Sequence, residues 1–420
     1  MSSSNSQEVR FGDFAIRRFN PTRDLPNVLR VWRECGWIRN DSDEIYTEHY
    51  YSVGDPYVAT LDDGAECACH VMPGFVRYQD EDLKLAGIAC VVTGRIARKR
   101  GIGKATVAHA LSEAKSNGAE IAVLNAFEQG FYDHLGFGCG TYEQIIRLDP
   151  ADLKKSEHRI PRRLGKDDWP AIYGAMKNRW VGHGGCVLDT PELFKSHTGW
   201  RPNGFGLGYF NDQDELTHFF YGTMNEENGP LGISTMGYQN GEQLRELFSL
   251  IRSLGDQIHC VELIEPPHIQ LQDLLMQPFR FRRVTKSSAF ENRHQASAFW
   301  QARILDLEAC LSKTHLPGPS VAFNLTLTDP IERIVPDARA WKSLGAAYII
   351  KVGEESSATE GFDPDLPSLR ATVNSFTRLW LGVRPATELA VTDVLRGSDE
   401  LLQDLDAVFR LPTAKLGWYF

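Results

Sequence analysis

The sequence predicts an α/β chain (α+β) made of two repeated units and a third, mixed unit. A basic glycine loop stands between an apolar stretch and a helical stretch within residues 84–116. The pattern at residues 16–32 recurs at residues 160–176, and the 420 residues are enough for two or three domains. We expect domains at residues 1–149, 150–293 and 294–420.

The repeat opens each of the first two units with a strand, a turn and an amphipathic helix. In the first copy Asp24 is expected at the helix start and Pro26 in its first turn. Asp168 and Pro170 have these places in the second copy. Asp is a common helix cap, and Pro fits the first turn because its missing N–H has no helical partner there.

The glycine loop of the first unit predicts a pyrophosphate site. Residues 84–93 are apolar and β-branched, as in a buried strand, and residues 105–116 have helical spacing that ends at Gly118. Between them runs Arg98-Lys99-Arg100-Gly101-Ile102-Gly103-Lys104. Glycine lets the backbone approach a ligand, and the N–H groups of a starting helix attract an anion, as do the four cations.

Two common phosphate loops do not fit this stretch. A Walker A loop needs a glycine where Arg98 stands and a hydroxyl residue where Ala105 stands. A Rossmann fingerprint needs a third glycine at Thr106. What remains is R-x-x-G-x-G between a strand and a helix.

The segment after this helix again predicts a strand followed by a helix. Residues 120–126 are strand-like, and Tyr132, Gly136 and Phe137 follow as Tyr-x-x-x-Gly-Phe. Together the two motifs resemble motif A and the closing motif of the GNAT superfamily of N-acetyltransferases. The resemblance implies that acetyl-CoA is bound, with its pantetheine arm between splayed strands, and that coenzyme A is the product. The implied cofactor residues are Val91, Val92, Thr93, Arg98, Lys99, Arg100, Gly101, Ile102, Gly103, Lys104, Ala126 and Phe127.

The resemblance also gives Tyr132 a role, as the acid that protonates the departing thiolate. The alternative is a core aromatic residue beside Phe131 and Phe137. Direct transfer to the acceptor, with no covalent enzyme intermediate, is expected.

The second unit is expected to lack a cofactor. Residues 216–221 and 259–264 are strand-like, and residues 242–251 are helical. The turn before this helix, residues 236–242, has no cation and includes Glu242. Such a turn would repel a pyrophosphate, so we expect an acetyltransferase fold that does not bind acetyl-CoA.

The third unit resembles a sterol carrier protein-like domain. We expect an amphipathic helix at residues 299–311 and an alternating strand at residues 321–329, with an acidic loop at residues 353–365. Two acetyltransferase-like units before such a domain resemble the enhanced-intracellular-survival (Eis) family. That family acetylates amines, including aminoglycosides and lysines, and often forms hexamers.

The family resemblance also implies a general base at the end of the chain, the carboxylate of Phe420. Trp418, Tyr419 and Phe420 would expose much apolar surface unless they pack. Hydrophobic anchoring without chemistry is the alternative. The chain departs from the family at Gly94-Arg95, where a Pro is common, and at Phe127, where a small hydroxyl residue is common.

A cationic acceptor is expected to bind after the first helix. Carboxylates attract an ammonium group and aromatic faces offer cation–π contacts, although a solvated helix face would explain the acids almost as well. The candidate residues are Glu34, Trp37, Asp41 and Tyr46. A lipid-binding protein that uses the third domain, with the other units as scaffold, is the alternative function, but the intact loop and Tyr132 argue against it.

Composition excludes several other classes. The formal net charge is -10, so we do not expect a nucleic-acid partner that is attracted by an overall positive charge. Residues 1–9 lack the apolar core of a signal peptide, and no run is long enough for a membrane helix. The 8 scattered cysteines suit reduced thiols in a cytoplasm, and none has zinc spacing, so we expect a cytoplasmic protein with no metal. We expect no membrane partner, and the Eis resemblance implies a homo-oligomer.

Overall fold

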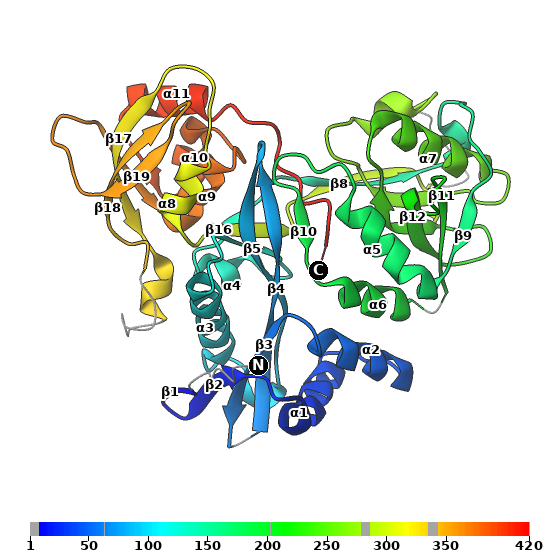
Figure 1. The fold of residues 1–420 in the computed structure, drawn as a ribbon, viewed down its shortest axis with the longest axis horizontal. Coiled ribbons are helices and arrows are strands. Elements are labelled where there is room, and N and C mark those ends of the chain that lie inside the picture. The colour runs from blue at the N-terminus through cyan, green and yellow to red at the C-terminus, as the bar shows by residue number, and fades with distance from the viewer. Residues whose placement is uncertain (1–7, 63, 202, 279–285, 335–342, 420) are drawn as a thin grey trace. The chain divides into compact units, whose positions relative to one another are not determined.

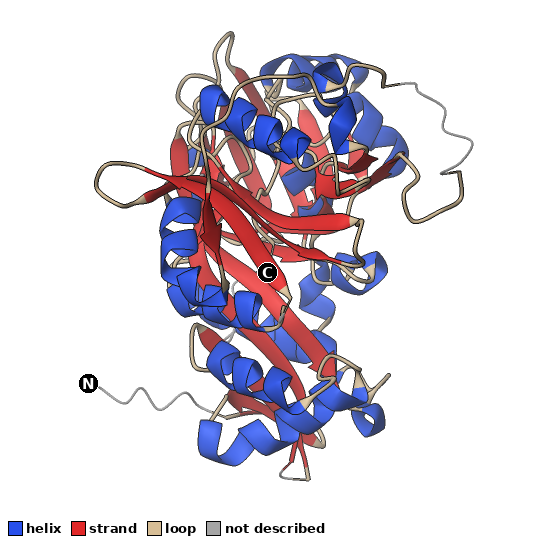
Figure 2. Ribbon diagram, turned by 90° about the vertical axis from the view of Figure 1, so that its right-hand side faces the viewer, coloured by secondary structure: helices blue, strands red, loops and turns tan. Residues whose placement is uncertain are grey.

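The computed structural model describes residues 8–62, 64–201, 203–278, 286–334 and 343–419. They divide into two compact units (Figure 1). Unit 1 contains residues 1–141, 182–190 and 299–420, and unit 2 contains residues 142–181 and 191–298. Both are mixed α/β, with helices packed against sheets (Figure 2). None of the described helices is long and apolar enough to cross a bilayer.

The main sheet of unit 1 has nine strands among the described residues. In spatial order they are β1 (Val9–Phe11), β2 (Phe14–Arg18), β3 (Asp55–Leu61), β4 (Gly64–Tyr78), β5 (Glu81–Thr93), β6 (Ile121–Asn125), β16 (Trp300–Ile304) and β7 (Gly138–Cys139), with β10 (Cys186–Leu188) paired to β4. The strands expected at residues 84–93 and 120–126 are confirmed as β5 and β6.

Four helices of the described residues accompany this sheet: α1 (Pro21–Glu34), α2 (Asp41–Tyr51), α3 (Ile102–Ser116) and α4 (Gln129–Asp133). The predicted start of the first helix at Asp24 is wrong, because α1 begins at Pro21 and Asn20 caps it. Asp24 is instead fully buried and pairs with Arg17 at 2.6 Å. Helix α3 ends as predicted, with Gly118 at φ +87°.

Unit 1 also contains a sheet of five described strands. They are β19 (Ser357–Glu360), β18 (Ala347–Val352), β17 (Val321–Thr328), β20 (Ser368–Thr372) and β21 (Leu395–Arg396), accompanied by α8 (Leu307–Ser312), α9 (Val373–Trp380), α10 (Ala386–Thr392) and α11 (Asp399–Val408). The single helix expected at residues 299–311 is wrong. Its first half is strand β16, whose five residues are all buried between β6 and β7. A strand buried on both faces shows no alternation, so periodicity could not separate it from a helix.

The sheet of unit 2 has seven described strands. They are β15 (Arg293–Ser297), β8 (Glu143–Leu148), β14 (Val261–Ile264), β13 (Leu231–Gly237), β12 (Leu216–Met224), β11 (Gly204–Phe210) and β9 (Arg162–Leu164), with helices α5 (Trp169–Lys177), α6 (Pro191–Gly199) and α7 (Gly241–Ser253). The crossover β13–α7–β14 joins parallel strands, as β5–α3–β6 does in unit 1.

Two strands lie on the other side of the expected domain boundaries. Strand β8 lies within residues 1–149 but pairs with β14 and β15 of unit 2. Strand β16 lies within residues 294–420 but completes the main sheet of unit 1. These pairings are non-local, and a boundary drawn along the sequence does not reveal them.

Candidate functional site

Strands β5 and β6 separate at the site. Their parallel pairing ends at Ile88 and Leu124, so residues 91–93 continue without a partner on that edge. A register shift between β4 and β5 accompanies the separation, and Cys90 adopts φ +48°, which is uncommon for a residue with a side chain. The free edge can bond an extended ligand in the manner of an added strand.

Helix α3 begins beside this gap with uncapped N–H groups. Its N-cap, Gly101, has φ +80° and no side chain to accept from the first turn. A Cβ on Gly103 would come within 3.1 Å of Thr93 Oγ1 and 3.4 Å of Phe131 Cζ, so a larger residue would crowd the site. Four orphan donors and the positive end of the helix dipole therefore face outward for an anion.

The basic side chains of the loop differ in their contacts. Arg98, Lys99 and Arg100 are exposed, and Arg100 forms an ion pair with Asp13. Lys104 Nζ lies 5.8 Å from the ring centroid of Phe131. Because the Arg100 side chain is paired with Asp13, its backbone N–H is the group that we expect to contact a ligand.

Tyr132 is held in α4 on the far side of the gap. Glu128 caps this helix by accepting from the N–H groups of Gly130 at 3.1 Å and Phe131 at 2.5 Å. The Tyr132 ring is 2% exposed and packs against Phe131, Phe137 and Phe127, with centroids 4.9, 6.0 and 6.0 Å away.

The chemistry of Tyr132 follows from this burial. Burial raises the pKa of Tyr132, and the neighbouring Cys69 and Cys90 add to the shift. Its hydroxyl has no hydrogen-bond partner in the described part of the chain. A protonated, unpaired phenol is suited to donate a hydrogen bond or a proton to a ligand.

Cys69 and Cys90 were not among the candidate residues. Both raise the pKa of Tyr132, and burial raises the pKa of Cys90 to about 12. They are therefore neutral thiols that line the site, and neither is an activated nucleophile. Cys69 and Cys90 lie on adjoining strands, next to the residues expected at the gap. This placement is the signal that could have identified them.

The acceptor candidates are in different environments. Trp37 is 42% exposed and packs edge-on against Trp32, with centroids 5.1 Å apart. Asp41 is exposed at the start of α2, and Tyr46 is half-buried. Glu34 is engaged within the chain, because it pairs with Arg30 at 2.6 Å and accepts from the Arg95 N–H at 2.9 Å.

A row of aromatic rings connects Trp37 with the strand gap. Trp32 lies 5.8 Å from Tyr51 and 6.1 Å from Tyr50, and Tyr50 lies 4.9 Å from His70. Burial lowers the pKa of His70 to about 4, so the row is uncharged. The composition of residues 34–51 indicates an aromatic site, but it does not show that the rings form a continuous row.

The segment before residue 420 packs within unit 1. Trp418 is 2% exposed, the Cys186 N–H donates to the Leu416 carbonyl at 2.9 Å, and the Tyr419 ring lies 5.5 Å from Phe299. The Phe299 carbonyl accepts from the Ala126 N–H at 2.6 Å. Phe420 lies outside the described residues, so its role stays a prediction. Phe127 and Ala126 follow β6 directly, and Phe127 is 73% exposed.

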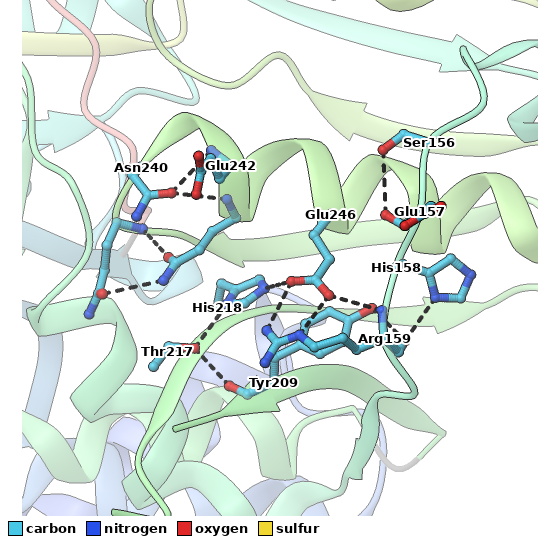
Figure 3. A network of polar contacts seen from close by, with 12 residues as sticks. Ser156, Glu157, His158, Arg159, Tyr209, Thr217, His218, Asn240, Glu242 and Glu246 are labelled. Carbon is cyan, nitrogen blue, oxygen red and sulfur yellow. Dashed lines mark hydrogen bonds and ion pairs between the residues drawn. The ribbon is translucent and has the colours of Figure 1, made fainter. Parts of the chain in front are cut away.

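Unit 2 has a different helix start at the corresponding crossover. Asn240 Oδ1 accepts from the N–H groups of Glu242 and Gln243 at 3.0 Å each, and Gln243 Oε1 accepts from the Gln239 N–H at 2.7 Å (Figure 3). The first-turn N–H groups that have no side-chain cap in α3 are thus hydrogen-bonded within the chain in α7. No group of three or more His, Cys, Asp or Glu side chains that could hold a metal is found among the described residues of either unit.

Comparison with known proteins agrees with this geometry. The sequence matches the family model for the "Acetyltransferase (GNAT) domain" over residues 15–140. These residues are a GNAT acetyltransferase domain. The chain is therefore an acyltransferase enzyme, and its GNAT domain contains the strand gap, the uncapped helix and Tyr132. No curated protein matches the chain.

Several solved structures share the fold over the whole chain. A probable N-acyltransferase from Enterococcus faecalis superposes with a TM-score of 0.77 at 17% identity, covering 97% of this chain and 99% of that one. A GCN5-related N-acetyltransferase from Kribbella flavida gives 0.74 at 20% identity, with 97% and 98% covered. Eis1 from Mycobacterium abscessus gives 0.74 at 15% identity, with 97% and 100% covered. These likenesses establish the fold beyond the GNAT domain.

Proposed function

We propose that this chain transfers the acetyl group of acetyl-CoA directly to a primary amine, on a cationic small molecule or on a lysine side chain. The observation that supports the proposal best is the uncapped start of α3 beside the unpaired edge of β5. Acetyl-CoA is a thioester, and when bound it supplies the activated acetyl group.

The residues present fit this donor. The N–H groups of residues 100–104 form the anion site, and Arg98 and Lys99 stand beside it with exposed cationic side chains. The free edge of residues 91–93 can bond the amides of the pantetheine arm, and one of its N–H groups can polarise a thioester carbonyl. Ala126 and Phe127 border the gap from the β6 side.

Two proton transfers are required of this chain. Tyr132 holds its proton because burial raises its pKa, and it donates that proton to the leaving sulfur. The amine must lose a proton before it attacks, and we assign that step to the carboxylate of Phe420, directly or through water. Packing of Trp418 and Tyr419 supports this assignment, because it holds the chain against unit 1 as far as residue 419.

The acceptor is proposed to contact the aromatic row and the exposed Asp41. Trp37 and Tyr46 offer ring faces to an ammonium and its carbon frame. Because Glu34 is already paired with Arg30 and bonded by the Arg95 N–H, the exposed Asp41 is the more available carboxylate. An aminoglycoside or a polyamine, as in the Eis family, fits this chemistry.

We extend the proposal to the remaining units as the Eis resemblance suggests. The second unit is a GNAT-like scaffold, and residues 294–420 provide a sterol carrier protein-like domain that supports the site. The chain assembles in the cytoplasm as a homo-oligomer, and the Eis resemblance suggests a hexamer. A lipid ligand is less favoured, because the outward face of the five-stranded sheet carries exposed Thr326, Thr328, Lys351 and Arg370.

The test is turnover of acetyl-CoA by the full chain with a panel of polyamines, aminoglycosides and lysine peptides, followed by thiol release. Amine-dependent thiol release is the expected result. Gly103→Glu is the matched negative control, because it places a carboxylate at the anion site. Equal rates of thiol release with and without an amine would overturn the assignment of an amine as the acceptor.

A further inference from the structure

Tyr132 stands in a helix that is too short to fix its own position. Helix α4 has 5 residues, and helices of this length gain their stability from tertiary contacts. Glu128 caps the start of the helix. At its end the Tyr132 carbonyl accepts from the Leu135 N–H at 2.9 Å and from the Phe137 N–H at 3.2 Å. The placement of Tyr132 therefore depends on what holds the turn at residues 134–137.

Two side chains from distant parts of the chain hold the backbone of this turn. Asn374 Nδ2, in the first turn of α9, donates to the Asp133 carbonyl at 2.9 Å and to the Phe137 carbonyl at 2.8 Å. Arg303 Nη1, in β16, donates to the Leu135 carbonyl between them. Asn374 thus spans both ends of the turn, and the two residues whose N–H groups bond Tyr132 are themselves held by their carbonyls.

Two glycines let the backbone approach these donors closely. Gly136 adopts φ +81°, and a Cβ there would collide with Arg303 Nη1. A Cβ on Gly138 would collide with the Asn374 carbonyl oxygen. Helix α9 therefore packs directly on the backbone that follows Tyr132, with no side chain between them.

The start of α9 is fixed by a reciprocal cap. Thr372 Oγ1 accepts from the Ser375 N–H at 3.3 Å, and Ser375 Oγ accepts from the Thr372 N–H at 3.0 Å. Asn374 lies within this cap and bonds the turn through Nδ2, whereas its buried Oδ1 has no hydrogen-bond partner among the described residues. A buried acceptor without a partner costs stability, so stability alone does not account for an asparagine at this place.

We propose that Asn374 is a positioning residue for acetyl transfer, which holds the turn after α4 so that the Tyr132 hydroxyl keeps its place at the strand gap. Asn374 acts through Tyr132 and touches no substrate. This inference rests on the proposed role of Tyr132 as the acid that protonates the leaving thiolate. Proton transfer requires hydrogen-bond distance, so a small displacement of the acid lowers the rate by a large factor.

The chain offers a matched control in Asn324, on β17 of the five-stranded sheet. Asn324 Nδ2 also bridges two carbonyls, those of Asp363 at 2.7 Å and Leu366 at 3.0 Å. Neither carbonyl belongs to the turn after Tyr132. Loss of this bridge should therefore lower stability in the same way and leave Tyr132 in place.

The first test measures the position of Tyr132 without using activity. The full chain is prepared with meta-fluorotyrosine at position 132, and its fluorine NMR signal is recorded with and without coenzyme A. We expect Asn374→Ala to shift or broaden the signal, because the ring then takes more than one orientation, and Asn324→Ala to leave it unchanged. An unchanged signal in Asn374→Ala, or equal changes in the two variants, would overturn the proposal.

The second test is a double-mutant cycle in full-chain kinetics. We expect Asn374→Ala to lower kcat by roughly 10–10²-fold with coenzyme A affinity unchanged, and to have little further effect in the Tyr132→Phe background, where no hydroxyl is left to position. Asn374→Leu, which keeps the side-chain volume, replaces Asn374→Ala in both tests if that variant does not fold.

The two single variants separate failure of this inference from failure of the proposed function. Full turnover in Tyr132→Phe would overturn the acid role of Tyr132 and the inference with it. A loss of turnover in Tyr132→Phe, together with an equal fold-loss from Asn374→Ala in both backgrounds, would overturn the inference alone, because Asn374 would then act independently of the hydroxyl.

Discussion

Arg303 and Asp329 form a bidentate ion pair in which both side chains are completely buried. The two contacts measure 3.0 and 2.6 Å, and Arg303 also donates to the Leu135 carbonyl. Arg303 lies in β16 and Asp329 follows β17, while Leu135 follows the helix that carries Tyr132. The pair therefore links the five-stranded sheet to the turn behind the candidate acid.

Breaking this pair should destabilise unit 1. Asp329→Asn leaves the Arg303 charge buried without compensation, and we expect the free energy of unfolding to fall by about 3–5 kcal/mol. Denaturant unfolding measures the change. Asp82→Asn is the control, because its pair with Arg77 at 2.6 Å is exposed and is worth less than about 1 kcal/mol. Similar losses in the two variants would contradict the assigned importance of the buried pair.

Removal of the Tyr132 hydroxyl should affect catalysis and leave binding intact. In Tyr132→Phe we expect turnover to fall by roughly 10²–10⁴-fold, with coenzyme A affinity unchanged in calorimetry. Because burial raises the pKa of Tyr132 above its ordinary value, wild-type activity should show no loss from its deprotonation below about pH 10. Near wild-type turnover in the variant would make Tyr132 a packing residue.

The local order of the GNAT domain could be predicted from the sequence. Apolar β-branched content defines β5, and helical spacing with Gly118 defines α3, so the loop between them was identified correctly. These features depend on neighbouring residues. Tyr132 and Cys69 belong to one core cluster although they are far apart in the chain, and no local sequence pattern indicates this.

The missed features are those that depend on distant residues. Strand β16 pairs with β6, and Trp300 lies opposite Asn125, which stands 175 residues earlier in the chain. All the residues of β16 are buried, so no periodicity indicates its structure. Glu34 is expected to attract a cationic acceptor, but in the fold it pairs with Arg30 on the same helix and accepts a hydrogen bond from the Arg95 N–H. Only the fold brings Arg95 to Glu34.

Unit 2 should lose stability in acid because of the contacts of Glu246 in α7. Glu246 pairs with Arg159 at 2.9 Å and with His218 Nε2 at 3.0 Å, and Arg159 holds the pKa of Glu246 at about 2 (Figure 3). A depressed carboxylate pKa stabilises the fold above the ordinary value near 4.5, and this stability is lost as the pH falls toward 2. Burial lowers the pKa of His218 as well, so the loss should begin below about pH 6.5.

Amide hydrogen exchange in α7 between pH 7 and pH 3 measures this effect, after correction for the intrinsic rates. We expect Glu246 to contribute about 1–3 kcal/mol at neutral pH, because its pKa is about 2 in the fold and the solvent around the exposed Arg159 screens part of the interaction. In Glu246→Gln the dependence below pH 4.5 should be largely absent. An unchanged pH profile in this variant would assign the acid sensitivity to other groups.

The carboxylate of residue 420 can be tested without removing any packed ring. A short Gly-Ser extension after Phe420 displaces the charge, and we expect most activity to be lost while coenzyme A binding and the unfolding midpoint stay unchanged. The wild-type rate should rise with pH through an apparent pKa that shifts or disappears in the extended protein. Full turnover in the extended protein would exclude this carboxylate as the base and leave Glu128 or a water chain as the next candidate.

Coenzyme A should bind once per chain, because the two crossover helices differ in their first turns. Gly101 leaves the donors of α3 open, whereas Asn240 Oδ1 occupies those of α7 at 3.0 Å. Calorimetric titration should give a stoichiometry of one for the wild type and no binding for Gly103→Glu, which adds a side chain where Thr93 Oγ1 is only 3.1 Å from a Cβ. Asn240→Gly is the matched control in unit 2 and should leave the stoichiometry at one, since that turn still lacks the cations of the α3 loop and keeps Glu242. A second equivalent of coenzyme A in the wild type would contradict the argument, because the α7 donors would then have to be available despite their cap.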